Sequence, residues 1–468
     1  MKKLKSKSRR ATIVAMFKHS IEKLKSGLTI VRLPMATVKS VTVLVLANTG
    51  SRYESPENQG IAHFFEHMVF KGTQAYPNAQ ELAAVVDGIG ADFNAFTSKE
   101  YTGYYVRAAS GHVELALDVV SDMLLTPKLD QADIDREKGV IVEELNMYVD
   151  SPQRHIDNVF DALMFATDPG LAHDIVGTKQ TIKSFKSQDF KKFLADWYDL
   201  SNLVLVVAGD ETVVSGDLLK GQISAAFAKT VTQARLKDTA ERRERNLHQK
   251  SFGQERVKLV YRKTKQASFV WGWPGLDRFH PDRYALAVLS TILGGNMSSR
   301  LFTEVREKRG LCYYVHTSED AFNDVGVFGG GAGVDPVRAA EAIYVTLGEF
   351  LALANGEKTV SAAELQRAKE YIIGKTTLGL EDSESVAQYY GLRQLLKGKI
   401  ETADETLAKI KAVNLDDLSR IAKQLIKHDQ LRLAIIGPFK DQAKVEGWIA
   451  DALAQKGFKS VAKKSIKK

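Results

Sequence analysis

Two histidines and a glutamate fall within five positions of the segment IAHFFEHMVFKGT, residues 61–73. On a helix, His63 and His67 are one turn apart and present two imidazoles to one point, with Glu66 beside them. Two neutral imidazoles are good zinc ligands, and a neighbouring carboxylate can act as a general base. A chance surface cluster is the alternative, but the neighbours are apolar and buried polar groups need a partner. The segment therefore predicts part of a catalytic metal site.

A catalytic zinc needs a third protein ligand, and the segment DIDREKGVIVEELNMY, residues 133–148, offers candidates. Glu137 and Glu144 are seven positions apart, which is two turns of a helix and places them on one face. Glu143 points elsewhere, although a shift of one residue would exchange it with Glu144. The alternative is an ordinary charged helix surface. Spacing favours a carboxylate ligand from this segment.

The order of the elements around these residues repeats in the second half of the chain. Strands are predicted at GLTIVRL and SVTVLVLANTG and again at RVKLVYR and ASFVWGWPG, so that Val31 and Val260 correspond at a distance of 229 positions. The strands NLVLVVAGD and LRLAIIGP bring Gly209 and Gly437 into correspondence 228 positions apart. Two matches at nearly one offset indicate a duplication into two similar domains.

The second copy has no histidine or glutamate where the first has its motif. RYALAVLSTILGG, residues 283–295, takes the place of IAHFFEHMVFKG. A helix can thus fill this place without polar residues, so packing does not require His63, Glu66 or His67. Elsewhere in the first half we predict a helix over 57–72, a helix beginning after Asn78, two strands around Ser98, and two long helices over 112–150 with a break near Pro127.

Composition excludes several classes of protein. The 468 residues are 44% hydrophobic and 26% charged, which is ordinary for a soluble globular protein of several domains. No uncharged apolar run is long enough to predict a membrane span. The single cysteine, Cys312, excludes an intrachain disulfide and a thiolate zinc cluster and fits a reducing compartment, so we expect a cytoplasmic protein, with an organelle matrix as the alternative.

The net charge of +8 does not predict nucleic-acid binding, because the basic excess is terminal. Residues 1–10 and 456–468 each carry six Lys or Arg and no acid, and removing these twelve leaves 53 basic against 57 acidic residues. Charged termini are usually solvated tails. The predicted organisation is a basic tail at 1–20, a zinc-binding catalytic domain at 21–228, a linker at 229–254, a second homologous domain at 255–454 and a basic tail at 455–468.

These motifs together resemble the pitrilysin/insulinase family of zinc metallopeptidases, in its short branch that includes mitochondrial processing peptidase and bacterial relatives. That family has H-x-x-E-H, a glutamate about 70 residues later and a ligand glutamate seven residues further on; here Glu137 and Glu144 follow His67 by 70 and 77 positions. The resemblance implies that His63, His67 and Glu144 bind one Zn²⁺ per chain. It also implies that Glu66 is the general base and that Glu137 orients a ligand histidine.

The resemblance extends from about residue 27 to 440 and implies further site residues. GADFNAFTSKEYT looks like the family's peptide-binding edge strand, with Asn94, Ala95 and Phe96 next to the zinc. Arg306 and Tyr313, in SSRLFTEVREKRGLCYYV, match an arginine–tyrosine pair that reaches the substrate from the second domain. An arginine can hold a substrate carbonyl and a tyrosine hydroxyl can stabilise an oxyanion. From the residues alone, Asn94 is equally a polar residue of a turn or strand end, and the pair is a surface arginine with a core-edge tyrosine.

Relatives of this length work as pairs around an enclosed chamber. The implied fold class is α+β, with two homologous α/β domains, each a mainly antiparallel sheet flanked by helices, in a clam-shell dimer. We expect a homodimer, or a heterodimer with a related non-catalytic chain, that hydrolyses unstructured or presequence-like peptides. A non-catalytic structural or assembly subunit is the alternative, and such chains commonly lose part of the motif that this chain keeps. A regulatory metal-binding protein without hydrolysis is a third possibility.

Overall fold

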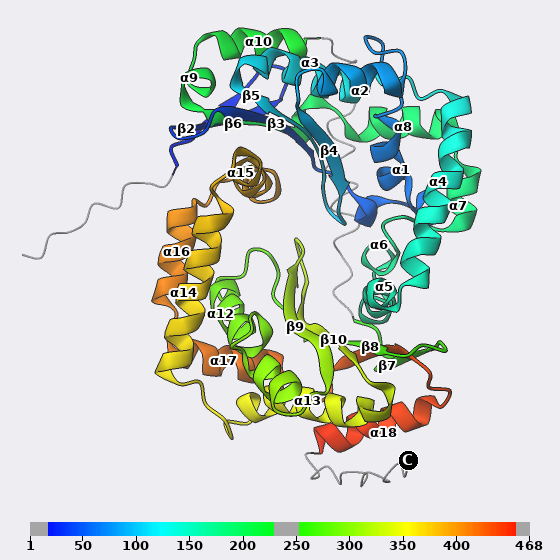
Figure 1. Cartoon of the computed structure of the whole chain (residues 1–468), viewed down its shortest axis with the longest axis vertical. Coiled ribbons are helices and arrows are strands. Elements are labelled where there is room, and N and C mark those ends of the chain that lie inside the picture. The colour runs from blue at the N-terminus through cyan, green and yellow to red at the C-terminus, as the bar shows by residue number, and fades with distance from the viewer. Residues whose placement is uncertain (1–16, 229–251, 455–468) are drawn as a thin grey trace, which may run out of the picture.

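The computed structural model describes residues 17–228 and 252–454, and within them the chain forms two β-sheets, each flanked by helices. Figure 1 shows the sheets as two separate layers, with the first half of the chain forming the upper one and the second half the lower one. Most of the predicted linker and tails, at 1–16, 229–251 and 455–468, falls outside the described residues.

The first sheet has the strand order β1-β2-β6-β3-β5-β4. Only β2 and β6 run parallel, and the other neighbours are antiparallel. Within the described residues β4 pairs with β5 alone, so its other edge is free. The bounds are β1 Ser20–Lys23, β2 Thr29–Met35, β3 Ser40–Ala47, β4 Asp92–Thr97, β5 Thr102–Ala109 and β6 Leu203–Asp210.

The second sheet repeats this topology with the order β7-β11-β8-β10-β9. Its one parallel pair, β7 with β11, corresponds to β2 with β6. The strands are β7 Val257–Tyr261, β8 Ala267–Pro274, β9 Cys312–Ala321, β10 Gly326–Val334 and β11 Arg432–Gly437. The predicted fold class, two homologous domains with mainly antiparallel sheets and flanking helices, is confirmed, whereas the clam-shell dimer stays a prediction.

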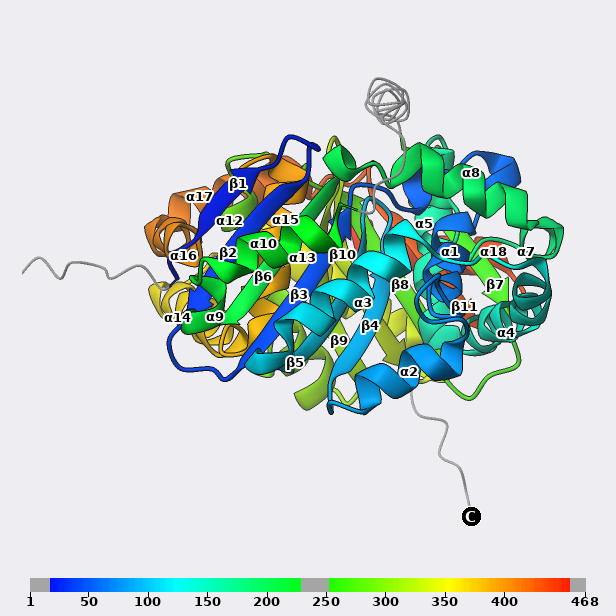
Figure 2. The same ribbon diagram turned by 90° about the horizontal axis from the view of Figure 1, so that it is seen from above.

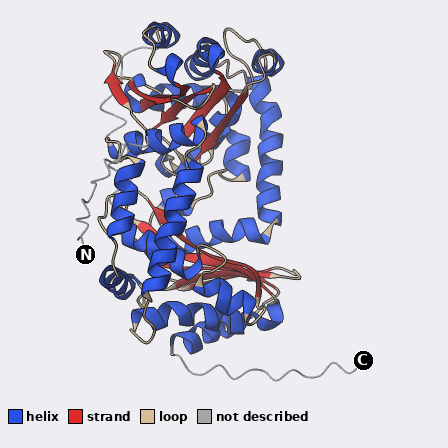
Figure 3. Ribbon diagram, turned by 60° about the vertical axis from the view of Figure 1, so that its left-hand side comes forward, coloured by secondary structure: helices blue, strands red, loops and turns tan. Residues whose placement is uncertain are grey.

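Helices cover the outer face of each sheet, as Figure 3 shows in blue against red strands. The first half forms α1 Ile61–Met68, α2 Ala79–Asp87, α3 Val113–Leu125, α4 Gln131–Asp150, α5 Pro152–Met164, α6 Pro169–Ala172, α7 Lys179–Ser184, α8 Ser187–Trp197, α9 Glu211–Val214 and α10 Leu218–Ala226. The second forms α12 Arg283–Gly294, a π-helix Phe302–Glu307, α13 Ala339–Ala354, α14 Ala362–Gly379, α15 Ser383–Lys397, α16 Ala403–Ala412, α17 Leu415–Leu425 and α18 Gln442–Leu453. None of the described helices combines the length and the apolar character needed to cross a bilayer.

The inner face of each sheet is covered by a helix from the other half of the chain. α15 packs on β3 and β6 of the first sheet, where Val386 and Tyr390 join its buried apolar residues. Reciprocally, α5 packs on β8 and β11 of the second sheet through Phe160 and Met164. Both helices lie between the sheets in Figure 1. Each domain therefore completes its core with an element of the other.

A buried cluster of charges adds to this connection between the domains. Arg52 is fully buried and pairs with Glu100 at 2.7 Å, Asp168 at 2.9 Å and Asp324 at 2.7 Å. Asp324 belongs to the turn between β9 and β10 in the second domain, and Arg278, also from the second domain, reaches Glu100 at 2.7 Å. Buried charges are tolerated only when they are paired in this way.

Most locally predicted elements of the first half are present. Asn78 caps α2 by accepting a hydrogen bond from the Glu81 amide at 2.9 Å, the turn between β4 and β5 includes Ser98, and α3 ends before Pro127. The helix predicted over 57–72 is shorter than expected. It starts only after Gly60, whose φ of +95° interrupts the helical path, and a 3-10 turn at Pro56–Asn58 precedes it.

Candidate metal centre

The histidine motif lies on α1, an eight-residue helix buried beside the edge of the first sheet. Its apolar side carries Phe64, Phe65 and Met68, which are fully buried in the domain core. The polar side carries His63, which is 9% exposed, and the half-buried Glu66 and His67. Because the apolar side is fixed in the core, the polar side is held toward α4 and β4.

Helix α4 places two carboxylates next to the histidine motif. Glu137 is buried and Glu144 is half-buried on the side that faces α1, and Ile141 and Leu145 anchor the same helix in the core. Glu143, the alternative that the spacing left open, is exposed to solvent. The structure therefore brings Glu144, and not Glu143, to the histidines.

Three side chains converge at this point. The Nε2 atom of His63 lies 3.7 Å from Oε1 of Glu144, and Nε2 of His67 lies 3.4 Å from Oε2 of the same carboxylate. The two imidazole rings are 4.7 Å apart between centroids. In the described part of the chain, His63, His67 and Glu144 form the one such group of three whose candidate ligand atoms all lie within 4.8 Å of one another.

This donor set fits a zinc ion. Two imidazoles and one carboxylate are a known ligand set for catalytic zinc, with one position left for water or substrate. Ligand atoms about 2.0–2.1 Å from a tetrahedral metal are about 3.3 Å from each other, close to the distances between the imidazole nitrogens and Glu144.

Contacts behind the donors fix their orientation. Nδ1 of His67 lies 3.0 Å from Oε1 of Glu137, whose other oxygen accepts from Nζ of Lys71 at 2.6 Å. The contacts with His67 and with Tyr148 lower the pKa of Glu144. Glu137 was predicted in this place, and Lys71 and Tyr148 were not. Tyr148 lies one turn after Glu144 on the same face of α4, and Lys71 lies just past the end of α1.

Glu66 lies beside the cluster and is held from the end of β4. Its Oε2 atom accepts a hydrogen bond from the Thr97 hydroxyl, a contact that the sequence analysis missed. Burial raises the pKa of Glu66 above the usual value for a glutamate, although the Thr97 hydrogen bond and the charge of His67 oppose this shift. A carboxylate with a raised pKa beside a metal site is suited to accept and return a proton.

The two histidines differ in protonation. Burial and the neighbouring His67 lower the pKa of His63 to about 4. Burial also disfavours charge on His67, but the hydrogen bonds to Glu137 and Glu144 outweigh it and raise its pKa to about 9. Zinc binds neutral imidazole, so metal binding would release the proton that His67 shares with the carboxylates.

A cavity of about 550 Å³ opens at this cluster. Its lining includes three residues of the metal cluster and its base, His63, Glu66 and Glu144. The other lining residues are Thr97, Lys99, Tyr148, Arg154, Asp157, Asn158, Asp161, Asp174, Ile175 and Val176. Burial raises the pKa of Asp157 to about 6 and that of Asp161 to about 7. The volume lies within the usual range of ligand-binding pockets.

The predicted edge strand ends at this cavity. Asn94, Ala95 and Phe96 lie on β4, whose last residue is the Thr97 that contacts Glu66. Asn94 is exposed and its side chain accepts a hydrogen bond from the Ala95 amide at 2.9 Å, while Phe96 packs over Gly103 of β5. Figure 2 shows β4 at the end of the first sheet, next to α1 and α2.

Arg306 and Tyr313 lie together but apart from the metal cluster. The Arg306 guanidinium is 5.7 Å from the Tyr313 ring centroid and 4.8 Å from that of Phe302. Tyr313 is 73% exposed at the start of β9, and neither residue lines the cavity at the cluster. The described chain therefore brings the pair together without bringing it to its own metal site.

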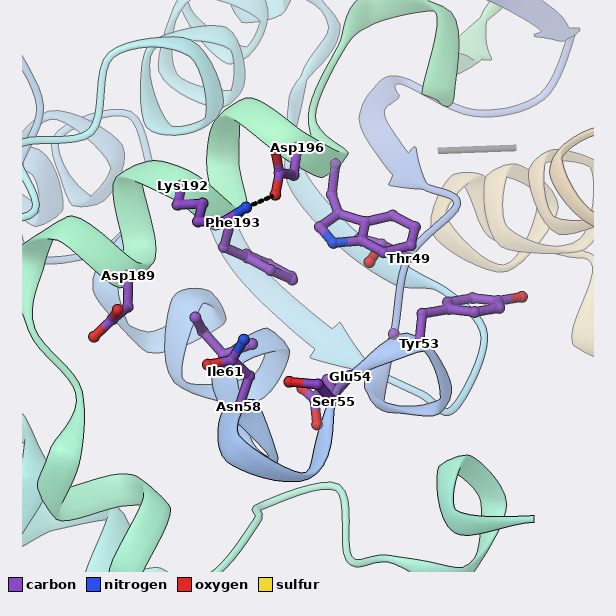
Figure 4. Close-up of a pocket in the computed structure, with 12 residues that line it drawn as sticks. Thr49, Tyr53, Glu54, Ser55, Asn58, Ile61, Asp189, Lys192, Phe193 and Asp196 are labelled. Atoms are coloured by element: carbon purple, nitrogen blue, oxygen red, sulfur yellow. Dashed lines mark hydrogen bonds and ion pairs between the residues drawn. The ribbon is translucent and has the colours of Figure 1, made fainter. Parts of the chain in front are cut away.

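A second cavity, of about 340 Å³, lies on another side of α1 (Figure 4). Its walls include Tyr53, Glu54, Asn58 and Ile61 on one side and Phe193 and Trp197 of α8 on the other. None of the predicted site residues lines it.

Both halves of the chain match family models. Residues 30–176 match the model described as insulinase (peptidase family M16), and residues 184–372 match the model described as peptidase M16 inactive domain. The metal cluster lies within the first match, and the second covers most of the domain whose helix α12 lacks the histidine motif.

Similar proteins are named as proteases. The chain is 37% identical over 423 residues to an uncharacterized zinc protease of Streptomyces coelicolor, an alignment that covers 90% of this chain and 89% of the relative. It is 37% identical over 420 residues to the uncharacterized zinc protease YmxG of Bacillus subtilis, covering 88% of this chain and 97% of the relative.

Solved structures share the fold. A protease from Helicobacter pylori superposes with a TM-score of 0.81 at 24% identity and covers 90% of this chain and 100% of its own. A peptidase M16 inactive domain from Pseudomonas fluorescens superposes with a TM-score of 0.79 at 20% identity. The superposition covers 91% of this chain and 99% of that structure.

Proposed function

The chain belongs to peptidase family M16, and from this membership and the geometry of its metal cluster we propose that it is a zinc-dependent endopeptidase that binds one Zn²⁺ per chain. The observation that carries the proposal is the convergence of His63, His67 and Glu144 on one point, with Glu66 beside them. The two relatives described above are named zinc proteases, and the alignments cover 89% and 97% of their own length. This similarity supports the same activity here.

The chain's own residues have distinct roles in this proposal. His63, His67 and Glu144 hold the metal, and Glu137 with Lys71 orients His67. A bound zinc ion supplies Lewis acidity, which polarises a carbonyl and makes water more acidic. Glu66 accepts the proton of the attacking water and returns it to the leaving amine, a transfer that general acid–base catalysis requires. Thr97 holds the Glu66 carboxylate in position through their hydrogen bond.

We propose that the substrate is an unstructured peptide or presequence-like segment bound along β4. The free edge of β4 can add an extended peptide through backbone hydrogen bonds, and its Asn94–Phe96 segment leads directly to Glu66. Backbone recognition is tolerant of sequence, so it supports a broad peptidase. An enclosed chamber would exclude folded proteins.

The complete site requires a second chain in this proposal. Arg306 and Tyr313 of one copy would act on the carbonyl held at the metal cluster of the other, since the described chain does not bring them to its own cluster. A homodimer would then carry two composite sites. A related non-catalytic partner chain is the alternative assembly.

The test is a zinc determination paired with cleavage of a quenched, unstructured peptide. We expect about one zinc per chain and cleavage that a chelator abolishes and added zinc restores. Glu66→Gln should keep the zinc and lose cleavage, because an amide does not accept a proton. A zinc-supplied, folded protein that binds no metal and cleaves nothing would favour the non-catalytic structural subunit instead. Normal cleavage by Glu66→Gln would show that another group is the base.

A further inference from the structure

The first turn of α1 is held by a carboxylate from outside the helix. Gly60, which precedes the helix, provides no side-chain cap. Instead, the carboxylate of Glu54, whose side chain is 1% exposed, accepts from the amide of Gly60 at 2.8 Å and from that of Ala62 at 2.8 Å. Ala62 directly precedes His63. Figure 4 shows Glu54 near the turn that carries Ile61.

A second residue, His173, completes this arrangement. Nε2 of His173 lies 3.0 Å from the same Glu54 oxygen that accepts from Gly60, and Nδ1 lies 2.7 Å from the carbonyl oxygen of Pro169. A carbonyl oxygen only accepts, so Nδ1 carries a proton. A carboxylate oxygen facing an unprotonated Nε2 would place two acceptors together. One proton therefore lies between Glu54 and His173.

His173 also joins α1 to the wall of the metal cavity. Its carbonyl oxygen accepts from Nζ of Lys99, at the turn that follows β4. The next three residues, 174–176, line the cavity. Gly177 then packs against Gly60 so closely that a Cβ atom on either would lie 2.3 Å from a backbone oxygen of the other segment. The metal-binding helix, the end of β4 and the cavity wall thus meet at one hydrogen-bonded pair.

We propose that Glu54 and His173 are positioning residues of the metal centre. Their shared proton locks the first turn of α1 against the segment 171–177, and this fixes His63 relative to Glu144 and to the cavity. The inference rests on the proposed function, since it concerns the same zinc site. A general contribution to folding would change stability alone, whereas a positioning role changes metal affinity and kcat together.

The test compares Glu54→Gln, His173→Ala and His173→Gln in the full-length protein. Zinc affinity is measured with Zn²⁺ alone in competition with a chromogenic chelator, next to kcat, KM and the unfolding temperature. For Glu54→Gln and His173→Ala we expect zinc affinity and kcat to fall by about 10-fold with KM nearly unchanged. His173→Gln should recover most of both, because its amide N–H can still donate to Glu54. Glu57→Gln, an exposed change in the same turn, is the matched control and should behave as wild type.

The outcomes separate the two proposals. If the wild-type protein binds no zinc and cleaves no peptide, the proposed function fails. If wild type binds and cleaves, but Glu54→Gln and His173→Ala keep its zinc affinity and kcat and lose only thermal stability, the positioning role is overturned. It is also overturned if His173→Gln is as impaired as His173→Ala. If Glu54→Gln does not fold, the comparison of the two His173 variants decides.

Discussion

Nδ1 of His67 lies 3.0 Å from Oε1 of Glu137, and this contact leaves the other ring nitrogen of His67 facing Glu144. A carboxylate that accepts from Nδ1–H fixes both the tautomer and the ring orientation of a histidine ligand. Lys71 in turn holds the second oxygen of Glu137 at 2.6 Å. A change at Glu137 should therefore alter the affinity for zinc.

Glu137→Gln should weaken zinc binding by about 10- to 100-fold without unfolding the protein, because an amide holds the His67 ring less firmly than a carboxylate. Zinc affinity from chelator competition measures the effect. Glu143→Gln is the matched control, since Glu143 is exposed on the same helix and should leave the affinity unchanged. Equal affinities for Glu137→Gln and wild type would show that Glu137 does not support the metal.

The buried Arg52 cluster should contribute several kcal/mol to the stability of the folded chain. Arg52→Met leaves Glu100, Asp168 and Asp324 without their shared cation, and removing one partner of a buried ion pair costs about 3–5 kcal/mol. Urea unfolding followed by tryptophan fluorescence measures this loss. Arg136→Met, at an exposed pair whose arginine is 70% exposed, should change the unfolding free energy by less than about 0.5 kcal/mol. A similar loss of unfolding free energy in the two variants would show that the buried Arg52 cluster does not stabilise the fold more than an exposed ion pair does.

The free energy of unfolding should decrease as pH rises, because carboxyl groups of the cavity wall must ionise in the folded state. Burial raises the pKa of Asp161 to about 7; Lys99 opposes the shift, and Asp320 and Asp157 add to it. An unfolded aspartate ionises near about pH 3.9, so between about pH 4 and about pH 7 the folded state binds more protons and the unfolding free energy decreases as pH rises.

Asp161→Asn should flatten this dependence, because it removes the group that must lose a proton in the folded state. As pH rises from about 4 to about 7, the unfolding free energy of the variant should therefore increase relative to that of wild type. Unfolding in urea at several pH values within this interval measures the slope. Asp130→Asn, a change at an exposed aspartate outside the cavity, is the control. Parallel curves for Asp161→Asn and wild type would exclude Asp161 as the source.

Local sequence patterns were sufficient for the elements that carry the site. The spacing of His63 and His67, the seven-residue step from Glu137 to Glu144 and the cap at Asn78 all depend on helical geometry, which the sequence expresses directly. The repeat of strand order likewise follows from alternating apolar residues. These features are set by neighbours within a few positions.

The long-range contacts could not be predicted in this way. α5 and α15 are amphipathic helices whose periodicity does not say which sheet they cover, and each packs on the sheet of the other half. The Glu54–His173 pair spans 119 positions, and Glu54 carries no local signal beyond a polar residue before a helix. Thr97 reaches Glu66 only because β4 ends next to α1.

The separation of Arg306 and Tyr313 from their own metal cluster leads to a prediction about assembly. If each site combines the cluster of one chain with the arginine–tyrosine pair of the other, Glu66→Gln and Arg306→Ala should both be inactive alone. A dimer of one chain of each kind has one complete site, from the chain that keeps Glu66 and the chain that keeps Arg306. Random mixing of equal amounts should restore roughly a quarter of the wild-type activity, since half of the dimers are mixed and each has one of two sites intact.

Co-refolding the two variants, followed by peptide cleavage, measures this recovery. The control mixes Glu66→Gln with a second cluster variant, His63→Ala, which should restore nothing, because neither chain then supplies an intact cluster. Recovery in the first mixture alone would establish a shared site. Activity of Arg306→Ala by itself would mean that Arg306 is dispensable. No recovery in mixtures whose dimers are shown to form would mean that cluster and pair act within one chain, which a closure of the second domain onto the first would then have to bring about.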